Sequence, residues 1–269
     1  MKPFYALLLP VLILACLSSC TQKQYYAPGL YQNDVQNMYK PHSKDSVKSR
    51  FYATGVLLSQ SGAGGQGTST SGLLNIYRAH TIPHFNFSYG AIGYLGSYDR
   101  NYVDLNNPAN SVVVNKSFAG YGLNGSTSFY LSTRKVDFRI IGVDLVYTHE
   151  GGDFLSFRKA QVGKPNVFSA AQAGMFTYGI FTEITVRPNN NVNFGFKLFV
   201  NNVTGDISRQ LNSINDPYNL GYISNGSSTY IGYTSYVGYK HFTLQNTISI
   251  GGSNNSLGNA IQLGLGYRF

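Results

Sequence analysis

The last nine residues of the chain alternate strictly between apolar and small or polar side chains. One face of an extended strand would carry Ile261, Leu263, Leu265, Tyr267 and Phe269, and the other would carry Gln262, Gly264, Gly266 and Arg268. A period of two predicts a β-strand with one apolar face. The same alternation recurs around 84–91, 176–187, 192–200, 231–240 and 242–250, and no stretch shows a sustained helical period. The sequence therefore predicts an all-β protein.

About ten strands (8–12) are expected. They lie near 51–59, 72–79, 84–98, 117–132, 136–149, 174–187, 192–202, 229–239, 242–251 and 260–269. Short connections (80–83, 133–135, 188–191, 240–241) alternate with longer ones (60–71, 99–116, 150–173, 203–228, 252–259). This alternation is typical of transmembrane barrels, whose inner turns are tight and outer loops long. The predicted fold is a closed, antiparallel, up-and-down transmembrane β-barrel, with its first strand paired to its last and a β-bulge near Ile140-Ile141.

The N-terminus indicates export. Lys2 precedes an apolar run from Ala6 to Leu17, which is too short to span a bilayer as a helix and fits a signal peptide. The run ends in Leu17-Ser18-Ser19-Cys20, which resembles a bacterial lipobox. Residues 1–19 are then a lipoprotein signal peptide, and Cys20 carries a diacylglycerol. The alternative is an ordinary signal peptide cleaved near Ser19. Since Cys16 leaves with the signal, the mature chain cannot form a disulfide.

Residues 20–50 differ from the barrel region at 51–269. They are rich in Gln, Lys, Pro, His and Ser, with little alternation, and they end in a basic stretch at 40–50. We expect a solvated, lipidated tether; the alternative is contact between its cations and phosphate headgroups. With an even number of strands, both ends of the barrel fall on the short-turn side. This places the N-terminus on the periplasmic side.

Three segments carry a resemblance to a known group. The lipobox, the following Tyr25-Tyr26-Ala27-Pro28 and the terminal Gly264-Leu265-Gly266-Tyr267-Arg268-Phe269 together look like lipidated outer-membrane β-barrel proteins of Bacteroidetes. The resemblance implies the outer membrane of a Gram-negative bacterium, and it implies that Leu265, Tyr267 and Phe269 form a C-terminal signal read by the barrel-insertion machinery. Thr21-Gln22-Lys23-Gln24 departs from the acidic residues that surface-exported lipoproteins of that group carry after the Cys. This departure favours a periplasmic anchor.

Charged side chains on the polar faces of the strands are predicted to form a network in the lumen. They are Asp137, Arg139, Asp144, Glu183, Arg187, Lys197, Lys240 and Arg268. Buried charges must be paired or hydrated. One interpretation is a salt-bridged filling of the lumen, and the other is a narrow, cation-lined passage for small anions.

The chain shows no convincing catalytic site. His149-Glu150 with Asp153 is the best acid–base candidate, for a surface hydrolase, but no pairing of the kind found in barrel proteases or lipid A deacylases accompanies it. No cofactor beyond the lipid on Cys20 and no metal site is expected. The net charge of +9 comes from scattered cations, which does not indicate nucleic-acid binding. Arg158, Lys159 and Lys164 are the candidate lipopolysaccharide contact, with a solvated loop as the alternative.

The leading hypothesis is an integral outer-membrane lipoprotein with a structural, adaptor or ligand-contacting role, in contact with outer-membrane lipids and serving an envelope complex. The rivals are the narrow pore, a soluble lipid-anchored β-sandwich binding module, and a surface hydrolase of lipid or peptide. A sandwich would turn its apolar faces toward each other, whereas a barrel turns them toward lipid.

Overall fold

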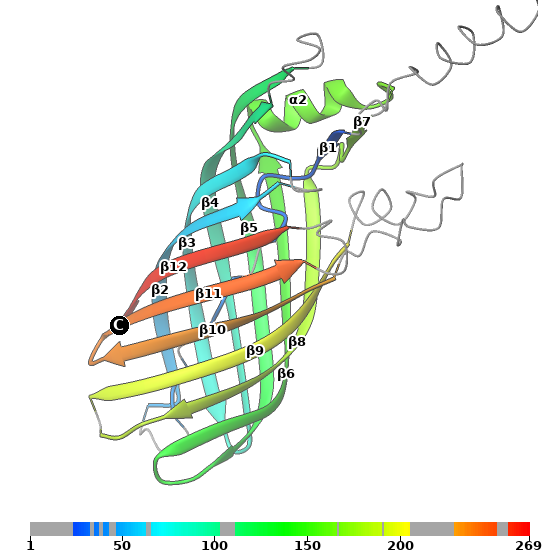
Figure 1. The fold of residues 1–269 in the computed structure, drawn as a ribbon. Helices are drawn as coiled ribbons and strands as arrows, with labels where there is room; N and C mark the ends of the chain where they lie inside the picture. Colours follow the sequence, from blue (N-terminus) through cyan, green and yellow to red (C-terminus); the bar gives the residue numbers. More distant parts are fainter. Residues whose placement is uncertain are drawn as a thin grey trace, which may run out of the picture.

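A computed structural model gives the fold of the chain (Figure 1). It describes residues 24–32, 35–37, 40–42, 47–62, 66–102, 111–165, 167–189, 191–204, 229–251 and 258–269. The signal peptide and Cys20 therefore lie outside the described residues.

Ten strands form one closed barrel. Their bounds are β2 Ser49–Ser61, β3 Thr68–Ile82, β4 Phe85–Tyr102, β5 Val112–Ser132, β6 Val136–Gly151, β8 Gly174–Val186, β9 Val192–Thr204, β10 Thr229–Tyr239, β11 Phe242–Gly251 and β12 Asn259–Arg268. All neighbours are antiparallel, and the order around the wall is β10-β11-β12-β2-β3-β4-β5-β6-β8-β9. The first strand of the barrel pairs with the last, with Leu57 opposite Leu263. Each of the ten barrel strands is hydrogen-bonded to a neighbour on both sides, as a β-structure in hydrocarbon requires.

The predicted fold class is confirmed, and the strand positions agree to within a few residues. The connections alternate as expected between short ones, such as 83–84 and 240–241, and longer ones, such as 152–173 and 205–228. The bulge predicted near Ile140-Ile141 is present as a register shift between Arg139 and Gly142. The β-sandwich hypothesis is wrong, because the ten long strands form one closed sheet and do not divide into two facing sheets.

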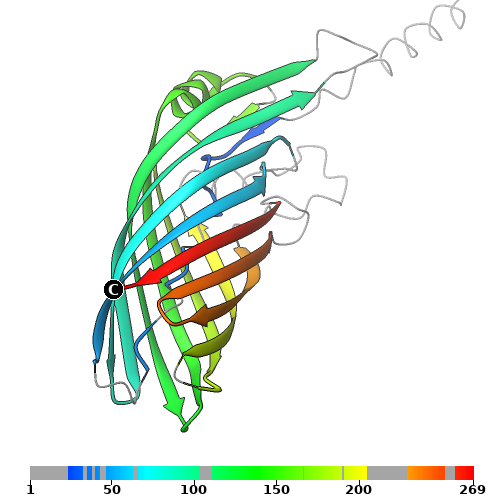
Figure 2. The ribbon, with the colours of Figure 1, turned by 90° about the vertical axis from the view of Figure 1, so that its left-hand side faces the viewer.

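The strands are of unequal length. β4 and β5 have 18 and 21 residues, whereas β11 and β12 have 10 each. Figures 1 and 2 show the long strands rising past the level at which the short ones end, on the side of the long connections. We call this side the loop end of the barrel, and the opposite side, where the tight connections lie, the turn end.

A cap sits on the loop end. It consists of the helix α2 (Asp153–Gln161) and a two-stranded parallel sheet of β1 (Gln24–Tyr26) with β7 (Val167–Ser169). The sequence showed no sustained helical period, and α2 is a helix that this criterion did not find. Nine residues are too few for a clear period, but Asp153 in the first turn and Lys159 in the last favour the helix through its dipole. Among the described residues, no helix is long and apolar enough to cross a bilayer.

Side chains of the barrel strands alternate between inward and outward. Along β12 the residues Ile261, Leu263 and Leu265 are more than half exposed, while Gln262 is buried. The wall thus turns aliphatic and aromatic side chains outward and mostly polar ones inward, the reverse of a water-soluble domain.

Candidate functional site

The lumen is filled by the chain's own N-terminal segment. We call the described residues between 24 and 42 the plug; from Tyr26 to His42 each is buried. Their hydrogen-bond partners lie on β2, β3, β4, β5, β6, β9 and β11, so the segment is surrounded by the wall. The expectation of a solvated tether is therefore wrong for these residues. In both ribbon views the dark-blue segment runs inside the barrel (Figures 1 and 2).

Near the loop end, the backbone of one plug residue, Gly29, is held on both sides. The Gly29 N–H donates to Glu150 Oε2 (2.5 Å), and the Gly29 carbonyl accepts from Ser69 Oγ (2.6 Å) and from Gln60 Nε2. The approach is close, because a Cβ on Gly29 would lie 2.5 Å from the ring of Phe118. Only glycine fits between this ring and the three polar partners.

Glu150 joins the plug to the cap. Its Oε1 accepts from Arg158 Nη2 of α2 at 2.6 Å, and both side chains are at most 1% exposed. Arg158 also donates to the carbonyl of Ala170 and lies over the Phe154 ring. A buried anion thus satisfies a buried guanidinium and a plug amide together, which offsets the desolvation of both charges.

Aromatic rings pack around the entry of the plug. Tyr98 stacks on Phe154 of α2 with 4.4 Å between ring centroids, and Tyr26 meets Phe157 edge-on at 5.1 Å. Tyr25 stacks on Phe168 of β7 at 5.2 Å. Burial raises the pKa of the Tyr25 phenol above its usual value, so this ring stays neutral. In the described part of the loop end, these rings form a compact aromatic layer around the plug.

Three asparagines form a closed ring at mid-lumen. Asn75 Nδ2 on β3 donates to Asn37 Oδ1 (2.9 Å), Asn37 Nδ2 donates to Asn124 Oδ1 on β5 (2.6 Å), and Asn124 Nδ2 donates back to Asn75 Oδ1 (2.8 Å). Asn37 Nδ2 also lies 3.1 Å from Ser88 Oγ on β4. Each amide is a donor and an acceptor, so a buried polar side chain of the plug is fully engaged by the wall.

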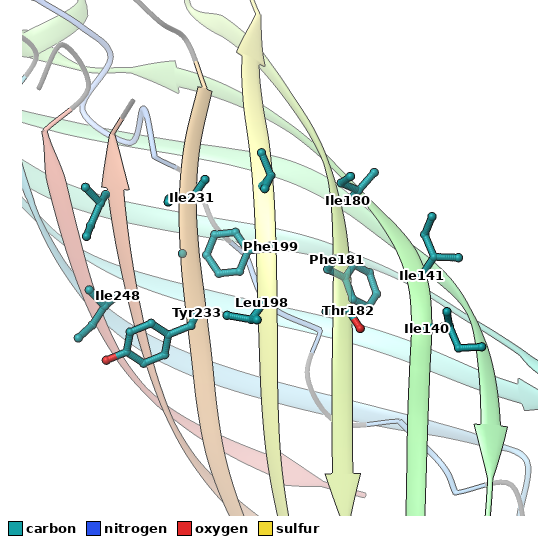
Figure 3. A pocket seen from close by; sticks show the side chains of 13 residues that line it. Ile140, Ile141, Ile180, Phe181, Thr182, Leu198, Phe199, Ile231, Tyr233 and Ile248 are labelled. Carbon is teal, nitrogen blue, oxygen red and sulfur yellow. The ribbon is translucent and has the colours of Figure 1, made fainter. Parts of the chain in front are cut away.

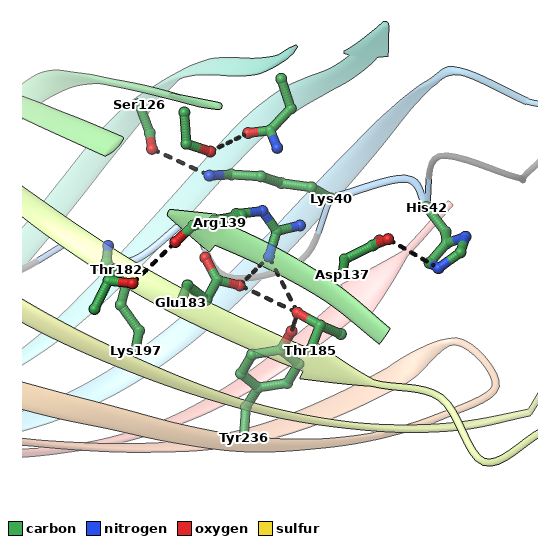
Figure 4. Close-up of polar contacts among 12 residues, drawn as sticks. Lys40, His42, Ser126, Asp137, Arg139, Thr182, Glu183, Thr185, Lys197 and Tyr236 are labelled. Carbon is green, nitrogen blue, oxygen red and sulfur yellow. Dashed lines mark hydrogen bonds and ion pairs between the residues drawn. The ribbon is translucent and has the colours of Figure 1, made fainter. Parts of the chain in front are cut away.

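Deeper in the lumen, toward the turn end, lies a cluster of charges (Figure 4). Lys197 pairs with Asp144, Arg139 pairs with Glu183, and His42 of the plug lies 3.1 Å from Asp137. The plug adds two further contacts. Lys40 Nζ donates to Ser126 Oγ (3.2 Å), and Gln36 Oε1 accepts from Lys197 Nζ (2.5 Å).

The ring of Phe181 contacts both lysine ammonium groups of this cluster. Its ring centroid lies 4.1 Å from Lys197 Nζ and 5.1 Å from Lys40 Nζ, so one ring faces an ammonium of the wall and one of the plug. The ring covers Gly142, where a Cβ would lie 2.2 Å from Phe181. Gly142 follows the bulge at Arg139, so the bulge and the missing side chain together make room for the ring.

The eight charged residues predicted for the lumen divide into three groups. Asp137, Arg139, Asp144, Glu183 and Lys197 are buried inside the barrel. Arg187 and Arg268 are half-buried where β8 and β12 end, at the rim of the turn end. Lys240 does not face the lumen: it has a φ of 51° in the two-residue turn after β10, where the alternation stops, and its side chain is exposed.

The candidate acid–base pair is not formed. Consecutive residues of a strand face opposite sides. Glu150 points inward to Arg158, while His149 stacks against Tyr121 on the outer face, with 5.5 Å between centroids. The prediction that the chain is not an enzyme stays a prediction. The described residues hold no cluster of three or more His, Cys, Asp or Glu side chains suited to a metal.

The candidate lipopolysaccharide contact is also divided. The prediction is wrong for Arg158, because the helix turns its side chain inward to Glu150 and leaves it fully buried. Lys159 and Lys164 are exposed at the loop end. At the C-terminus, Leu265, Tyr267 and Phe269 all point outward from the barrel, with exposed fractions of 58%, 38% and 67%.

The outer wall has one broad apolar hollow, of about 740 Å³, over β6 and β8 to β11 (Figure 3). Outward side chains such as Ile180, Leu198 and Ile231 line it, and the residues around it are almost all apolar. It offers few polar groups to orient a small molecule, which specific sites require. We regard it as part of the apolar outer surface.

Sequence reasoning missed the plug residues Gly29, Gln32, Gln36, Asn37, Lys40 and His42. One signal was available. Inward positions of β3 to β5 are small and polar, including Ser69, Ser71, Ser88, Ser126 and Ser128. Such side chains cannot fill a ten-stranded lumen, and protein interiors are close-packed, so another polar segment had to occupy the space.

No protein-family model matches the chain, and no curated protein matches its sequence. Among solved structures, Neisserial surface protein A is 11% identical, with 83% of this chain and all of that chain covered at a TM-score of 0.33. The β domain of the Bordetella autotransporter BrkA is 8% identical, covering 83% and 99%, at 0.45. The outer membrane protein OprG from Pseudomonas aeruginosa is 11% identical, covering 83% and 96%, at 0.36. At such low identity the likeness is one of fold alone.

Proposed function

We propose that this protein is an integral outer-membrane β-barrel whose lumen is closed by its own N-terminal segment, with a structural or adaptor role in the envelope of a Gram-negative bacterium. The outward surface supports the membrane location. On β4 the outward positions from Phe85 to Leu95 are aromatic, aliphatic or Gly, and Ser97 and Asp99 follow. Ten steps of about 3.4 Å at a tilt of about 45° give a belt roughly 24 Å tall, close to the ~25 Å expected of such barrels.

Aromatic side chains support the same interpretation at the turn end. Phe242, Tyr267 and Phe269 pack edge-on against one another on the outer face, with neighbouring centroids 5.1 to 5.3 Å apart. Rings of this kind gather where a barrel meets the headgroup region. We keep the proposal that Leu265, Tyr267 and Phe269 are read by the barrel-insertion machinery, because their outward exposure leaves them accessible to another protein.

The observation that carries the proposal is the plug. It engages the wall from Gly29 near the loop end to His42 at the turn end, and buried apolar residues pack around it near the loop end. The buried charges in between are paired across or onto the wall. A cation-lined passage for anions is therefore less well supported than a filled barrel. A filled barrel acts through its surfaces, and among the described residues the cap stands outside the barrel wall at the loop end.

The cap is then the contact region for a partner in an envelope complex or for lipopolysaccharide. Lys159 and Lys164 stand on it as exposed cations, which suits phosphate groups of the outer leaflet. We propose no nucleic-acid partner and no cofactor beyond the lipid predicted on Cys20.

Two measurements on the full-length protein test this function. We expect heat-modifiable migration on gels, because a closed barrel resists detergent until it is heated. We expect no conductance steps in planar bilayers at moderate voltage. Folding into a water-soluble monomer without detergent would overturn the membrane location. Regular ohmic steps from the wild-type protein would overturn the closed barrel in favour of the narrow pore.

A further inference from the structure

The plug runs through the barrel from one end to the other. At the turn end, Lys48 O accepts from the backbone N–H of Thr81, and Pro41 O accepts from Thr81 Oγ1 (2.7 Å). Asn37 lies at mid-lumen in the asparagine ring. Going backward along the chain, Gly29 is bonded at the level of Glu150, close to the loop end of β6.

The segment then leaves the lumen at the loop end. β1 pairs in parallel with β7, with Gln24 opposite Val167 and Tyr26 opposite Ser169. β7 belongs to the long connection between β6 and β8, which lies at the loop end and carries α2. The barrel strand β2 does begin at the turn end, as the strand parity predicts. The residues before β2 run back through the lumen, so that Gln24 lies at the loop end.

Chain length fixes the consequence for the residues before Gln24. Cys20 is four residues earlier in the sequence, and four fully extended residues reach at most about 14 Å. The apolar belt of an outer-membrane barrel is about 25 Å tall. A residue within that reach of Gln24 cannot lie at the membrane surface on the turn end.

We propose that the chain threads its own barrel, so that the residues preceding Gln24 emerge on the outer face of the membrane and the lipid predicted on Cys20 lies in the outer leaflet. This rests on the proposed membrane-spanning barrel, whose long connections face outward. It replaces the periplasmic anchor expected from strand parity. The cap and the acyl chains then act on the same side: α2 and the β1–β7 sheet hold the exit of the chain beside the lipid that anchors it.

Single-cysteine variants test the threading in intact cells. The chain has two cysteines, Cys16 in the predicted signal peptide and Cys20, so the parent protein serves as the blank for a membrane-impermeant maleimide. The test variant is Gln22→Cys. The loop-end control is Lys164→Cys, and the turn-end control is Lys135→Cys, both at exposed positions. Heat-modifiable migration of each variant verifies that its barrel is folded.

We expect Gln22→Cys and Lys164→Cys to be labelled in intact cells, and Lys135→Cys only after the outer membrane is permeabilised. If Gln22→Cys behaves like Lys135→Cys while Lys164→Cys is labelled, the threading is overturned and the membrane-spanning barrel stands. If the two controls are labelled equally in intact cells, the proposed function itself fails. A second variant, Thr21→Cys, must give the same pattern as Gln22→Cys. Labelling of the parent would support the exit on the outer face and overturn the lipid on Cys20.

Discussion

Truncating Asn37 to alanine should loosen the plug. The Asn37 side chain accepts one hydrogen bond from Asn75 and donates to Asn124 and Ser88. Its removal leaves the Asn75 amide hydrogen and the Asn124 oxygen buried without this partner. An unsatisfied buried group costs about 1–3 kcal/mol, so two cost roughly 2–6 kcal/mol. Each ~1.4 kcal/mol is a factor of about ten, so the lower bound already shifts the plug equilibrium about 30-fold.

The assay combines conductance with unfolding. We expect Asn37→Ala to show brief conductance steps that the wild-type protein lacks, together with a lower midpoint for thermal conversion on heat-modifiability gels. The control is Asn115→Ala, which removes an exposed asparagine that donates to Asp99 on the neighbouring strand. An exposed change of this kind costs at most about 0.5 kcal/mol. If the two variants are indistinguishable in both assays, the asparagine ring does not hold the plug and the reasoning is refuted.

Three further changes probe the cap, the plug and the belt, each followed by the same thermal conversion. Glu150→Gln leaves Arg158 buried without its counter-charge and should lower the stability by about 3–5 kcal/mol. The double variant with Arg158→Met should recover most of that loss. No recovery would contradict the pairing. Gly29→Ala should lower the stability by about 1–3 kcal/mol, because the added methyl group overpacks against the Phe118 ring. The same change should cost less in a Phe118→Ala background, and an equal cost would show that the ring is not the obstacle. Leu263→Arg, on the lipid-facing side of β12, should lower the stability by about 2–4 kcal/mol. The control Ser97→Arg, above the belt, should cost about 0–1 kcal/mol. Equal costs would argue against hydrocarbon at Leu263.

The barrel could be predicted because its determinants are local. Whether Leu263 faces outward and Gln262 inward follows from a period of two that is visible within nine residues, and the wall obeys it. The same rule failed where the backbone left the strand conformation. Lys240 occupies a left-handed turn position, and Arg158 lies on a helix that turns its side chain inward to Glu150. Both errors arose from extending an alternation, or a loop assignment, past the residues that justify it.

The plug could not be predicted because its contacts are not local. Gln32 donates to the carbonyl of Gly258, 226 residues away, and Gln36 accepts from Lys197, 161 residues away. Neither glutamine belongs to a periodic stretch, and in isolation a polar segment of this composition resembles a solvated linker. Its burial becomes favourable only inside a finished wall of polar and small side chains. The composition of that wall was visible in the sequence, but the segment that fills it could be identified only in three dimensions.

The charges of the lumen show why the wall and the plug depend on each other. In the charge cluster near the turn end, the described wall residues contribute two buried cations, Arg139 and Lys197, and three buried anions, Asp137, Asp144 and Glu183. Lys40 of the plug supplies the third cation, so that three positive charges face three negative ones. Without Lys40, this cluster would keep an excess of one anion that solvent cations would have to balance. The occupied barrel pairs these charges without solvent ions, which favours retention of the plug.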